Sequence, residues 1–396
     1  MSPSSERVRH RREFLRFLAA SPLMAYGLGD AWAQEPAAPL PKDALSVMDF
    51  EALARPKLPP AHWGYMASGT DDNLTLQANV AAYKNIQLRP RRLVDVSKVD
   101  TGIELFGQRF ASPIFLCPVG GHRMFHADGE VATARAAKAK NALQVLSTQT
   151  SIAVEDVAAA RGGGLWYQLY IPATWEDTEK MVRRVEAAGC PVLVWTIDLL
   201  GGRNLETATR FQRTDTRQCE SCHATATGGR RNSVMFSGLS STRFNPSNAT
   251  WDWVDRLKKM TSMKLVIKGI ETGEDARLAR EHGADGVLVS NHGGRATETL
   301  RPTIETVPEV VDAVGNQIPV LVDGGVRRGS DAFKAIANGA RAVGIGRPYT
   351  WGLAAFGQDG VERVLDILNA ELNLTMRQCG TPTLAQITKA HIRRMP

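Results

Sequence analysis

Short β-branched runs alternate with amphipathic segments along most of the 396 residues of this chain. Several of the amphipathic segments open with Ser, Thr or Asp and close with Gly, as capped helices do. Eight strands, each followed by a helix, predict a closed parallel (β/α)8 or TIM barrel of the α/β class. The predicted strands are 113–119, 142–148, 165–170, 192–198, 264–269, 286–291, 319–325 and 341–347. The clearest predicted helices are 128–141, 175–189, 272–283 and 330–339.

The remaining segments suggest how the chain is organised around this barrel. A linker at 34–45 and a helical lead-in precede the first strand, and a single barrel domain is predicted for 46–396. The stretch after strand four, about 199–248, is much longer than an ordinary loop and belongs at the C-terminal mouth of a barrel. The net charge of +7 comes without basic runs interleaved with aromatic residues, so no nucleic-acid partner is expected.

Residues 1–33 have the pattern of a targeting segment. Arg11-Arg12 precedes a weakly apolar stretch, and Ala31-Trp32-Ala33 offers small residues before a cleavage point. The stretch is too polar for a comfortable membrane span. These features predict a twin-arginine signal peptide and a periplasmic protein; the alternative is a basic tail with a chance arginine pair.

Glycine-rich turns follow the last two predicted strands. Asp323-Gly324-Gly325-Val326-Arg327 ends strand seven, and Gly346-Arg347 ends strand eight. Barrels bind phosphate at these two strand ends through backbone N–H groups, to which arginines add charge-assisted contacts. The pair of turns therefore indicates a phosphate site, although either one alone could be only a tight turn.

Three other strand ends carry polar residues suited to catalysis. Strand six ends in Ser290-Asn291-His292-Gly293-Gly294-Arg295, so that His292 can take a proton while Arg295 grips a carboxylate. Asp198, at the end of strand four, is placed to orient the imidazole. Lys268 stands in an otherwise apolar strand five and needs a negative partner, such as a reduced flavin.

These motifs resemble the FMN-dependent 2-hydroxy-acid dehydrogenase/oxidase family, which includes glycolate oxidase, lactate oxidase and mandelate dehydrogenase. The resemblance covers roughly residues 45–395 and implies FMN as cofactor and a small L-2-hydroxy acid, such as lactate, glycolate or mandelate, as substrate. It implies that His292 is the base, Asp198 its partner, and that Tyr65, Tyr170 and Arg295 contact substrate. The implied cofactor residues are Pro118, Val119, Gly120, Ser147, Gln168, Thr196, Lys268, Ser290, Asp323, Gly324, Gly325, Val326, Arg327, Gly346 and Arg347.

The chain departs from the family pattern at three positions. Gly120 replaces the alanine of the oxidases, which predicts room for a bulkier substrate and a respiratory acceptor (a cytochrome or quinone) rather than mainly oxygen. Gln149 stands where glycolate oxidase has an aromatic residue, and Arg203 is assigned to substrate binding in a shifted register. A peroxide-producing oxidase remains an alternative, as do an FMN-dependent isomerase and an electron carrier without catalysis. A homo-oligomer is expected from the resemblance.

A C-x-x-C-H motif, Cys219 to His223, lies in the long loop. It is the attachment signature of c-type haem through Cys219 and Cys222 with His223 as an axial ligand, and Met235 is the candidate distal ligand. A Cys219–Cys222 disulfide and free thiols are the alternatives. Cys117, Cys190 and Cys379 are predicted to be structural, and no Cys/His set has structural-zinc spacing.

Overall fold

The computed structural model describes residues 40–217 and 233–395. The chain divides into two units, residues 1–43 and 44–396. In the first unit only residues 40–43 are described, and they contain the 3-10 helix η1 (Pro41–Asp43). The second unit contains every other element discussed below.

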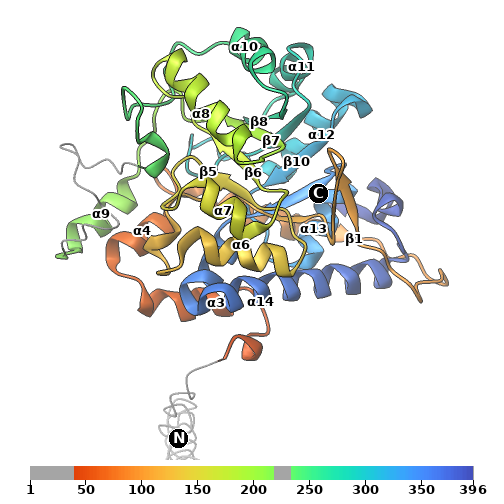
Figure 1. The fold of residues 1–396 in the computed structure, drawn as a ribbon. Coiled ribbons are helices and arrows are strands. Elements are labelled where there is room, and N and C mark those ends of the chain that lie inside the picture. Colours follow the sequence, from red (N-terminus) through yellow and green to blue (C-terminus); the bar gives the residue numbers. More distant parts are fainter. Residues whose placement is uncertain (1–39, 218–232, 396) are drawn as a thin grey trace, which may run out of the picture. The chain divides into compact units, whose positions relative to one another are not determined.

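Eight parallel strands form the central sheet in the order β4-β11-β10-β9-β8-β7-β6-β5. The ring closes where Leu116 pairs with Gln144, so the strands enclose a barrel (Figure 1). The predicted TIM barrel is confirmed, with strands one to three residues shorter at most ends. The strands are β4 (Ile114–Leu116), β5 (Val145–Ser147), β6 (Trp166–Leu169), β7 (Val192–Thr196), β8 (Lys264–Ile270), β9 (Gly286–Val289), β10 (Val320–Asp323) and β11 (Ala342–Ile345).

Helices follow the strands and cover the outside of the barrel (Figure 1). The hydroxyls of Thr174 and Thr272 cap two of them by accepting hydrogen bonds from the backbone three residues on, as the sequence predicts. The helices are α6 (Gly129–Ala139), α7 (Val154–Arg161), α8 (Trp175–Ala187), α10 (Asp252–Met260), α11 (Gly273–Glu281), α12 (Thr303–Val314), α13 (Gly329–Ala337) and α14 (Arg347–Cys379). None of the described helices is long and apolar enough to cross a bilayer.

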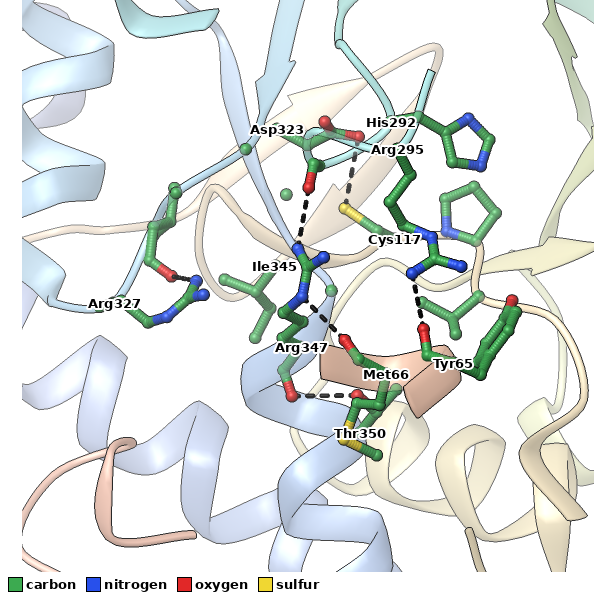
Figure 2. Close-up of a pocket in the computed structure, with 18 of the residues that line it drawn as sticks. Tyr65, Met66, Cys117, His292, Arg295, Asp323, Arg327, Ile345, Arg347 and Thr350 are labelled. Carbon is green, nitrogen blue, oxygen red and sulfur yellow. Dashed lines mark hydrogen bonds between the residues drawn. The ribbon is translucent and has the colours of Figure 1, made fainter. Parts of the chain in front are cut away.

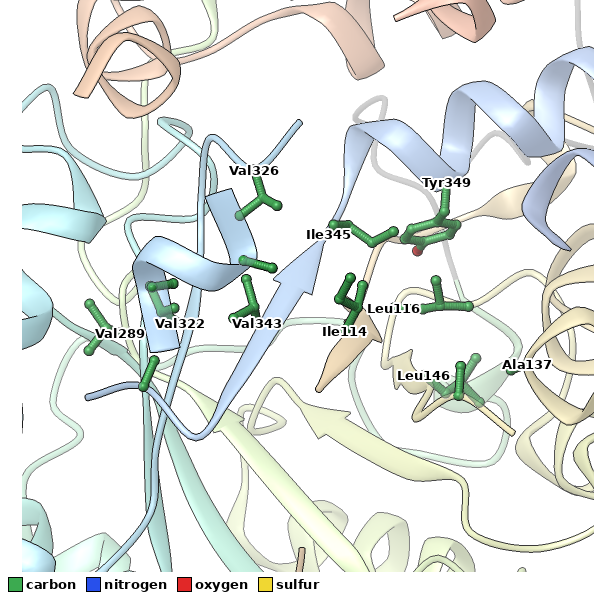
Figure 3. Close-up of a cluster of buried hydrophobic side chains, with 14 of the residues drawn as sticks. Ile114, Leu116, Ala137, Leu146, Val289, Val322, Val326, Val343, Ile345 and Tyr349 are labelled. Carbon is green, nitrogen blue, oxygen red and sulfur yellow. The ribbon is translucent and has the colours of Figure 1, made fainter. Parts of the chain in front are cut away.

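Alternate residues of each strand serve two different cores, because side chains alternate across a strand. On β10, Leu321 belongs to the inner core of the barrel, whereas Val322 packs outward in the core between strands and helices. Figure 3 shows part of the outer core, where Val322, Val343 and Ile345 lie among apolar neighbours. Each fully buried Val, Leu or Ile contributes about 1.5–3 kcal/mol.

The lead-in before the barrel is helical, as predicted, and its side chains form hydrogen bonds with residues at the C-terminal ends of the strands. Asn79 exchanges two side-chain hydrogen bonds with Asn291 (2.8 and 3.0 Å) and accepts a third from the Thr303 backbone (3.1 Å). All these groups are buried, so the network fixes the helix that contains Asn79, α5 (Leu74–Ala82), against the mouth of the barrel. The lead-in elements are α3 (Asp49–Ala54), η2 (Arg55–Lys57), α4 (Pro60–Ala67), α5 (Leu74–Ala82) and η3 (Tyr83–Asn85).

The sequence does not predict two small antiparallel sheets. One pairs β1 (Ile86–Leu88) with β12 (Ile392–Arg394), and the other pairs β2 (Ile103–Leu105) with β3 (Gln108–Phe110). Each strand has three residues, too few for the period-two pattern to show. The remaining short 3-10 helices are η4 (His122–Met124), η5 (Val234–Phe236), η6 (Gly315–Gln317), η7 (Leu384–Gln386) and η8 (Lys389–His391).

The long loop after β7 contains structure of its own. Its helix α9 (Glu206–Thr214) packs on α4, with Phe211 so close that a Cβ on Gly64 would lie 2.5 Å from it. Later in the loop, Phe244 pairs with Pro172 in an antiparallel bridge. The described parts of the loop therefore pack against α4 and against the segment that follows β6.

Candidate active site

A cavity opens at the C-terminal ends of the strands, with about 750 Å³ of empty volume that includes space open to solvent. Its position at the C-terminal ends of the barrel strands is where barrel enzymes have their active sites. Figure 2 shows His292 and Tyr65 on one side of it and Arg327 on the other. The predicted site residues that line it are Tyr65, Pro118, Val119, Lys268, His292, Arg295, Asp323, Gly324, Gly325, Val326, Arg327, Gly346 and Arg347.

His292, Asp198 and Lys268 form one connected group. The Asp198 carboxylate lies 2.8 Å from His292 Nδ1 through one oxygen and 3.4 Å from Lys268 Nζ through the other. The side chains of Asp198 and Lys268 are each only 4% exposed, so the ion pair is shielded from water. A buried pair of this kind is held by mutual attraction and hydrogen bonding.

Burial decides the protonation of this group. It lowers the pKa of His292, although the nearby Asp198 opposes the shift. Burial alone would raise the pKa of Asp198, but His292 and Lys268 outweigh it and keep that pKa below its usual value. At neutral pH His292 is therefore a neutral imidazole whose Nδ1 faces a carboxylate, and its Nε2 is able to accept a proton.

Backbone geometry aims the imidazole. His292 has φ of +59°, and Gly293 and Gly294 follow with φ of +66° and +74°. A non-glycine residue in this region costs about 1 kcal/mol or more, and such strain clusters at functional sites. The Nε2 atom lies 3.3 Å from the hydroxyl of Tyr170, which itself stacks on Phe244.

Arg295 and Arg203 come together beside this group. Arg295 donates through Nη1 to the carbonyl oxygens of Tyr65 and Ser68 (2.6 Å each), and its guanidinium carbon lies 4.8 Å from the centre of the Tyr65 ring. Arg203 donates to the Arg295 carbonyl oxygen at 3.5 Å. Burial and the proximity of Arg203 lower the pKa of Arg295 to about 10, so it remains a cation at neutral pH. Arg203, which the sequence assigns to substrate binding in a shifted register, therefore lies next to Arg295, the residue predicted to grip the substrate carboxylate.

The glycine-rich turn after β10 packs so closely against the lead-in that a side chain would not fit there. Gly324 and Gly325 have φ of +104° and +83°, and a Cβ on Gly325 would lie 1.9 Å from the Asn79 carbonyl oxygen. Arg327 lies in the same wall, is half-buried, and donates to the Val326 carbonyl oxygen. Arg347 donates to the carbonyl oxygens of Met66, Ser68 and Gly293 at 2.9–3.0 Å.

Some buried polar atoms near the C-terminal ends of the strands lack partners among the described residues, as is expected where a cofactor binds. Gln168 Nε2 and Thr196 Oγ1 have no hydrogen bond, and the second terminal nitrogen of Arg295 has none either. Unpaired buried polar groups cost roughly 1–3 kcal/mol each unless a ligand satisfies them. Ser147 bonds Gln168 (3.1 Å), and Ser290 bonds Asp323 (2.7 Å). These groups fit a flavin mononucleotide, which offers a polar ring edge, ribityl hydroxyls and a phosphate.

The structure removes the extra room expected at Gly120. A Cβ built there would lie 2.8 Å from Gln149 Cβ, so the missing methyl is filled by the neighbouring glutamine. The prediction of room for a bulkier substrate is therefore wrong. It was wrong because the sequence shows the lost methyl but not the side chain that takes its place.

The structure also bears on the predicted roles of Cys117 and Met235. Cys117 is buried, as a structural cysteine would be, and it also lines the cavity with its Sγ 3.7 Å from an Asp323 oxygen. Met235 is 1% exposed in the apolar core and is not presented as a ligand. The motif Cys219, Cys222 and His223 and the predicted signal peptide lie outside the described residues.

Several cavity residues could not be recognised from the sequence. Met66, Phe125 and Ile345 are apolar residues in helix, turn and strand patterns that look like ordinary core. Phe244 reaches Tyr170 only because the long loop folds back after a segment of more than forty residues. Contacts of this kind depend on the three-dimensional course of the loop.

Residues 54–394 match the family model described as FMN-dependent dehydrogenase. The chain is 42% identical over 350 residues to a peroxisomal (S)-2-hydroxy-acid oxidase of Oryza sativa subsp. japonica, covering 88% of this chain and 95% of that one. It is 40% identical over 354 residues to 2-hydroxyacid oxidase 2 of Mus musculus, covering 87% and 97%. A solved structure of a mandelate oxidase variant superposes with a TM-score of 0.79 at 36% identity, covering 89% and 99%.

The chain belongs to the FMN-dependent 2-hydroxy-acid oxidase/dehydrogenase family. It is an FMN-dependent oxidoreductase that oxidises 2-hydroxy acids, as the sequence predicts.

The prediction of a periplasmic protein exported by the twin-arginine route is corrected by the same comparisons. Relatives from Oryza sativa and Arabidopsis thaliana are named peroxisomal oxidases. The prediction rested on short local patterns in residues 1–33, namely an arginine pair, a weakly apolar stretch and small residues before a cleavage point, and such short patterns also occur by chance.

Proposed function

We propose that the enzyme oxidises a small L-2-hydroxy acid to the 2-keto acid, with His292 as the base. The observation that carries this is the 2.8 Å contact between His292 Nδ1 and the buried Asp198 carboxylate. A neutral imidazole held in one orientation accepts a proton at Nε2, and the carboxylate stabilises the imidazolium that forms. A base positioned in this way is worth roughly 10²–10⁴-fold in rate.

We assign substrate binding to the residues around the base. Arg295 and Arg203 hold the substrate carboxylate, because the buried Arg295 and the exposed Arg203 beside it are two neighbouring cations that favour an anion between them. Tyr65 supports that carboxylate from the wall that Arg295 covers. Tyr170, 3.3 Å from His292 Nε2, contacts the hydroxyl that is oxidised.

The proposed FMN site runs from the base to the two glycine-rich turns. When bound, FMN supplies an acceptor for the two electrons that leave the substrate. Lys268 provides a buried cation near the ring, Asp323 accepts from ribityl hydroxyls, and Arg327 and Arg347 hold the phosphate with the backbone of the turns. The other residues proposed to surround the cofactor are Pro118, Val119, Gly120, Ser147, Gln168, Thr196, Ser290, Gly324, Gly325, Val326 and Gly346.

For the final electron acceptor we propose oxygen, which takes two electrons and two protons to give hydrogen peroxide. The sequence favours a respiratory acceptor on the ground of Gly120 alone, and Gln149 now fills that space. The relatives compared above are named oxidases. We place the reaction in one domain, 46–396, with the loop 199–248 as an insertion.

Steady-state assays with the purified FMN enzyme test both parts of the proposal. L-lactate, glycolate and L-mandelate are each supplied with oxygen, and separately with an artificial electron-accepting dye without oxygen. The expected result is a 2-keto acid matched by an equal amount of peroxide. A keto acid formed with dye but little peroxide would reinstate a respiratory acceptor, and no keto acid under either condition would refute the function.

A further inference from the structure

Gln149 occupies a rigid turn directly after β5. Its backbone nitrogen donates to Ser147 Oγ (3.1 Å), and the next residue, Thr150, donates from its backbone to the Ser147 carbonyl oxygen (3.0 Å). From the other side, Ser233 Oγ donates to the Thr150 carbonyl oxygen (2.9 Å). The long loop therefore holds this turn, and the backbone of Gln149 is fixed at this position.

The side chain of Gln149 stands beside the substrate end of the cavity. A Cβ at Gly120 would lie 2.8 Å from Gln149 Cβ and 3.5 Å from the Tyr65 hydroxyl. Tyr65 lines the cavity and carries Arg295 against its ring. Gln149 therefore lies close to Tyr65, the residue that we assign, together with Arg295, to the substrate carboxylate.

The side-chain amide of Gln149 contains a hydrogen-bond donor, Nε2, that has no acceptor among the described residues. Its Nε2 atom is shielded from solvent and makes no hydrogen bond in the part of the chain that the structure describes. Carboxamide nitrogens only donate, so the atom that would satisfy Nε2 must be an acceptor. A buried donor without an acceptor is costly, and a ligand that brings one is favoured over the same ligand without it.

We propose that Gln149 Nε2 donates a hydrogen bond to an oxygen in the side chain of the substrate. The enzyme then selects small 2-hydroxy acids that carry a hydroxyl or carbonyl oxygen beyond the reacting carbon, over those with purely apolar side chains. This inference rests on the proposed function. The substrate stays small because Gln149 takes the space that the missing methyl of Gly120 would open.

L-glycerate and L-lactate make a matched pair for the test, because they differ by one hydroxyl on the third carbon. The rate of flavin reduction is measured without oxygen at several concentrations of each acid. We expect kcat/KM for L-glycerate to exceed that for L-lactate by about tenfold, the usual scale for one satisfied buried donor. In Gln149→Met, which keeps the length of the side chain but removes the donor, the ratio falls to near one.

The controls separate this inference from the function it rests on. Gln149→Met must retain FMN and must still oxidise L-lactate, which shows that the fold and the base are intact. Equal kcat/KM for the two acids in the wild-type enzyme, or the same ratio in Gln149→Met, would overturn the inference alone. If neither acid reduces the flavin, the proposed function fails and the inference falls with it.

Discussion

Asp198 holds two partners at once: one carboxylate oxygen lies 2.8 Å from His292 Nδ1, and the other lies 3.4 Å from Lys268 Nζ. The carboxylate comes from the segment after β7, the lysine from β8 and the histidine from the segment after β9. Neighbouring parallel strands bring these ends to the same rim of the barrel. One buried anion thus orients the base and compensates a buried cation.

Replacing Asp198 with asparagine should lower kcat about 10²–10³-fold, because the amide cannot stabilise the imidazolium. The buried Lys268 also loses its counter-charge, so a modest loss of stability is expected. Stopped-flow flavin reduction and thermal unfolding measure the two effects. A variant that turns over at the wild-type rate would show that Asp198 does not assist His292.

The pH dependence of kcat/KM should have an unusually low acid limb. The base must be neutral, and burial lowers the pKa of His292 from 6.5 to about 4. Activity that depends on this group is therefore present above that value and is lost as the pH falls through it. Because Asp198 opposes the shift, Asp198→Asn should move the limb lower still. A limb at or above 6.5 in the wild-type enzyme would contradict this assignment.

Gly325→Ala should disrupt the proposed phosphate turn. The new Cβ would lie 1.9 Å from a backbone oxygen of Asn79, at a φ of +83° that alanine rarely adopts. We expect a loss of about 2–4 kcal/mol in stability, together with loss of FMN from the purified protein. Gly201→Ala is the matched control, since nothing lies within 4 Å of its Cβ position. Equal stability of the two variants would be incompatible with the close approach.

Glu271 should make the enzyme less stable as the pH rises. Burial, helped by the nearby Asp198, raises its pKa from 4.5 to about 7. Between pH 4.5 and about 7, Glu271 keeps its proton in the folded chain but loses it in the unfolded chain. The free energy of unfolding therefore falls as the pH rises through this range. Glu271→Gln should raise the melting temperature at pH 8 by a few degrees and not at pH 4. The exposed Glu274→Gln serves as control, and an identical pH profile for both variants would remove Glu271 from this role.

The barrel could be predicted because its strands and helices repeat a strong pattern. His292, Arg295 and Asp323 were predictable as well, since polar residues at strand ends have few structural uses. The sequence indicates a changed pocket wall at Gln149, but neither the contact of Gln149 with Gly120 nor the place of Cys117 in the cavity could be predicted, because both depend on which neighbours the fold brings together. The three-residue strands β1, β2, β3 and β12 were too short to show a pattern.

The role of His292 as the base is tested most simply by flavin reduction with a 2-hydroxy acid in the absence of oxygen, in the variants His292→Gln and His282→Gln. His282 also faces a carboxylate, with Nδ1 3.0 Å from Asp255, but it is not among the residues that line the cavity. We expect that His292→Gln keeps FMN and is reduced at least about 10²-fold more slowly, while His282→Gln behaves as wild type. Reduction of the His292→Gln flavin at the wild-type rate would contradict the assignment of the base.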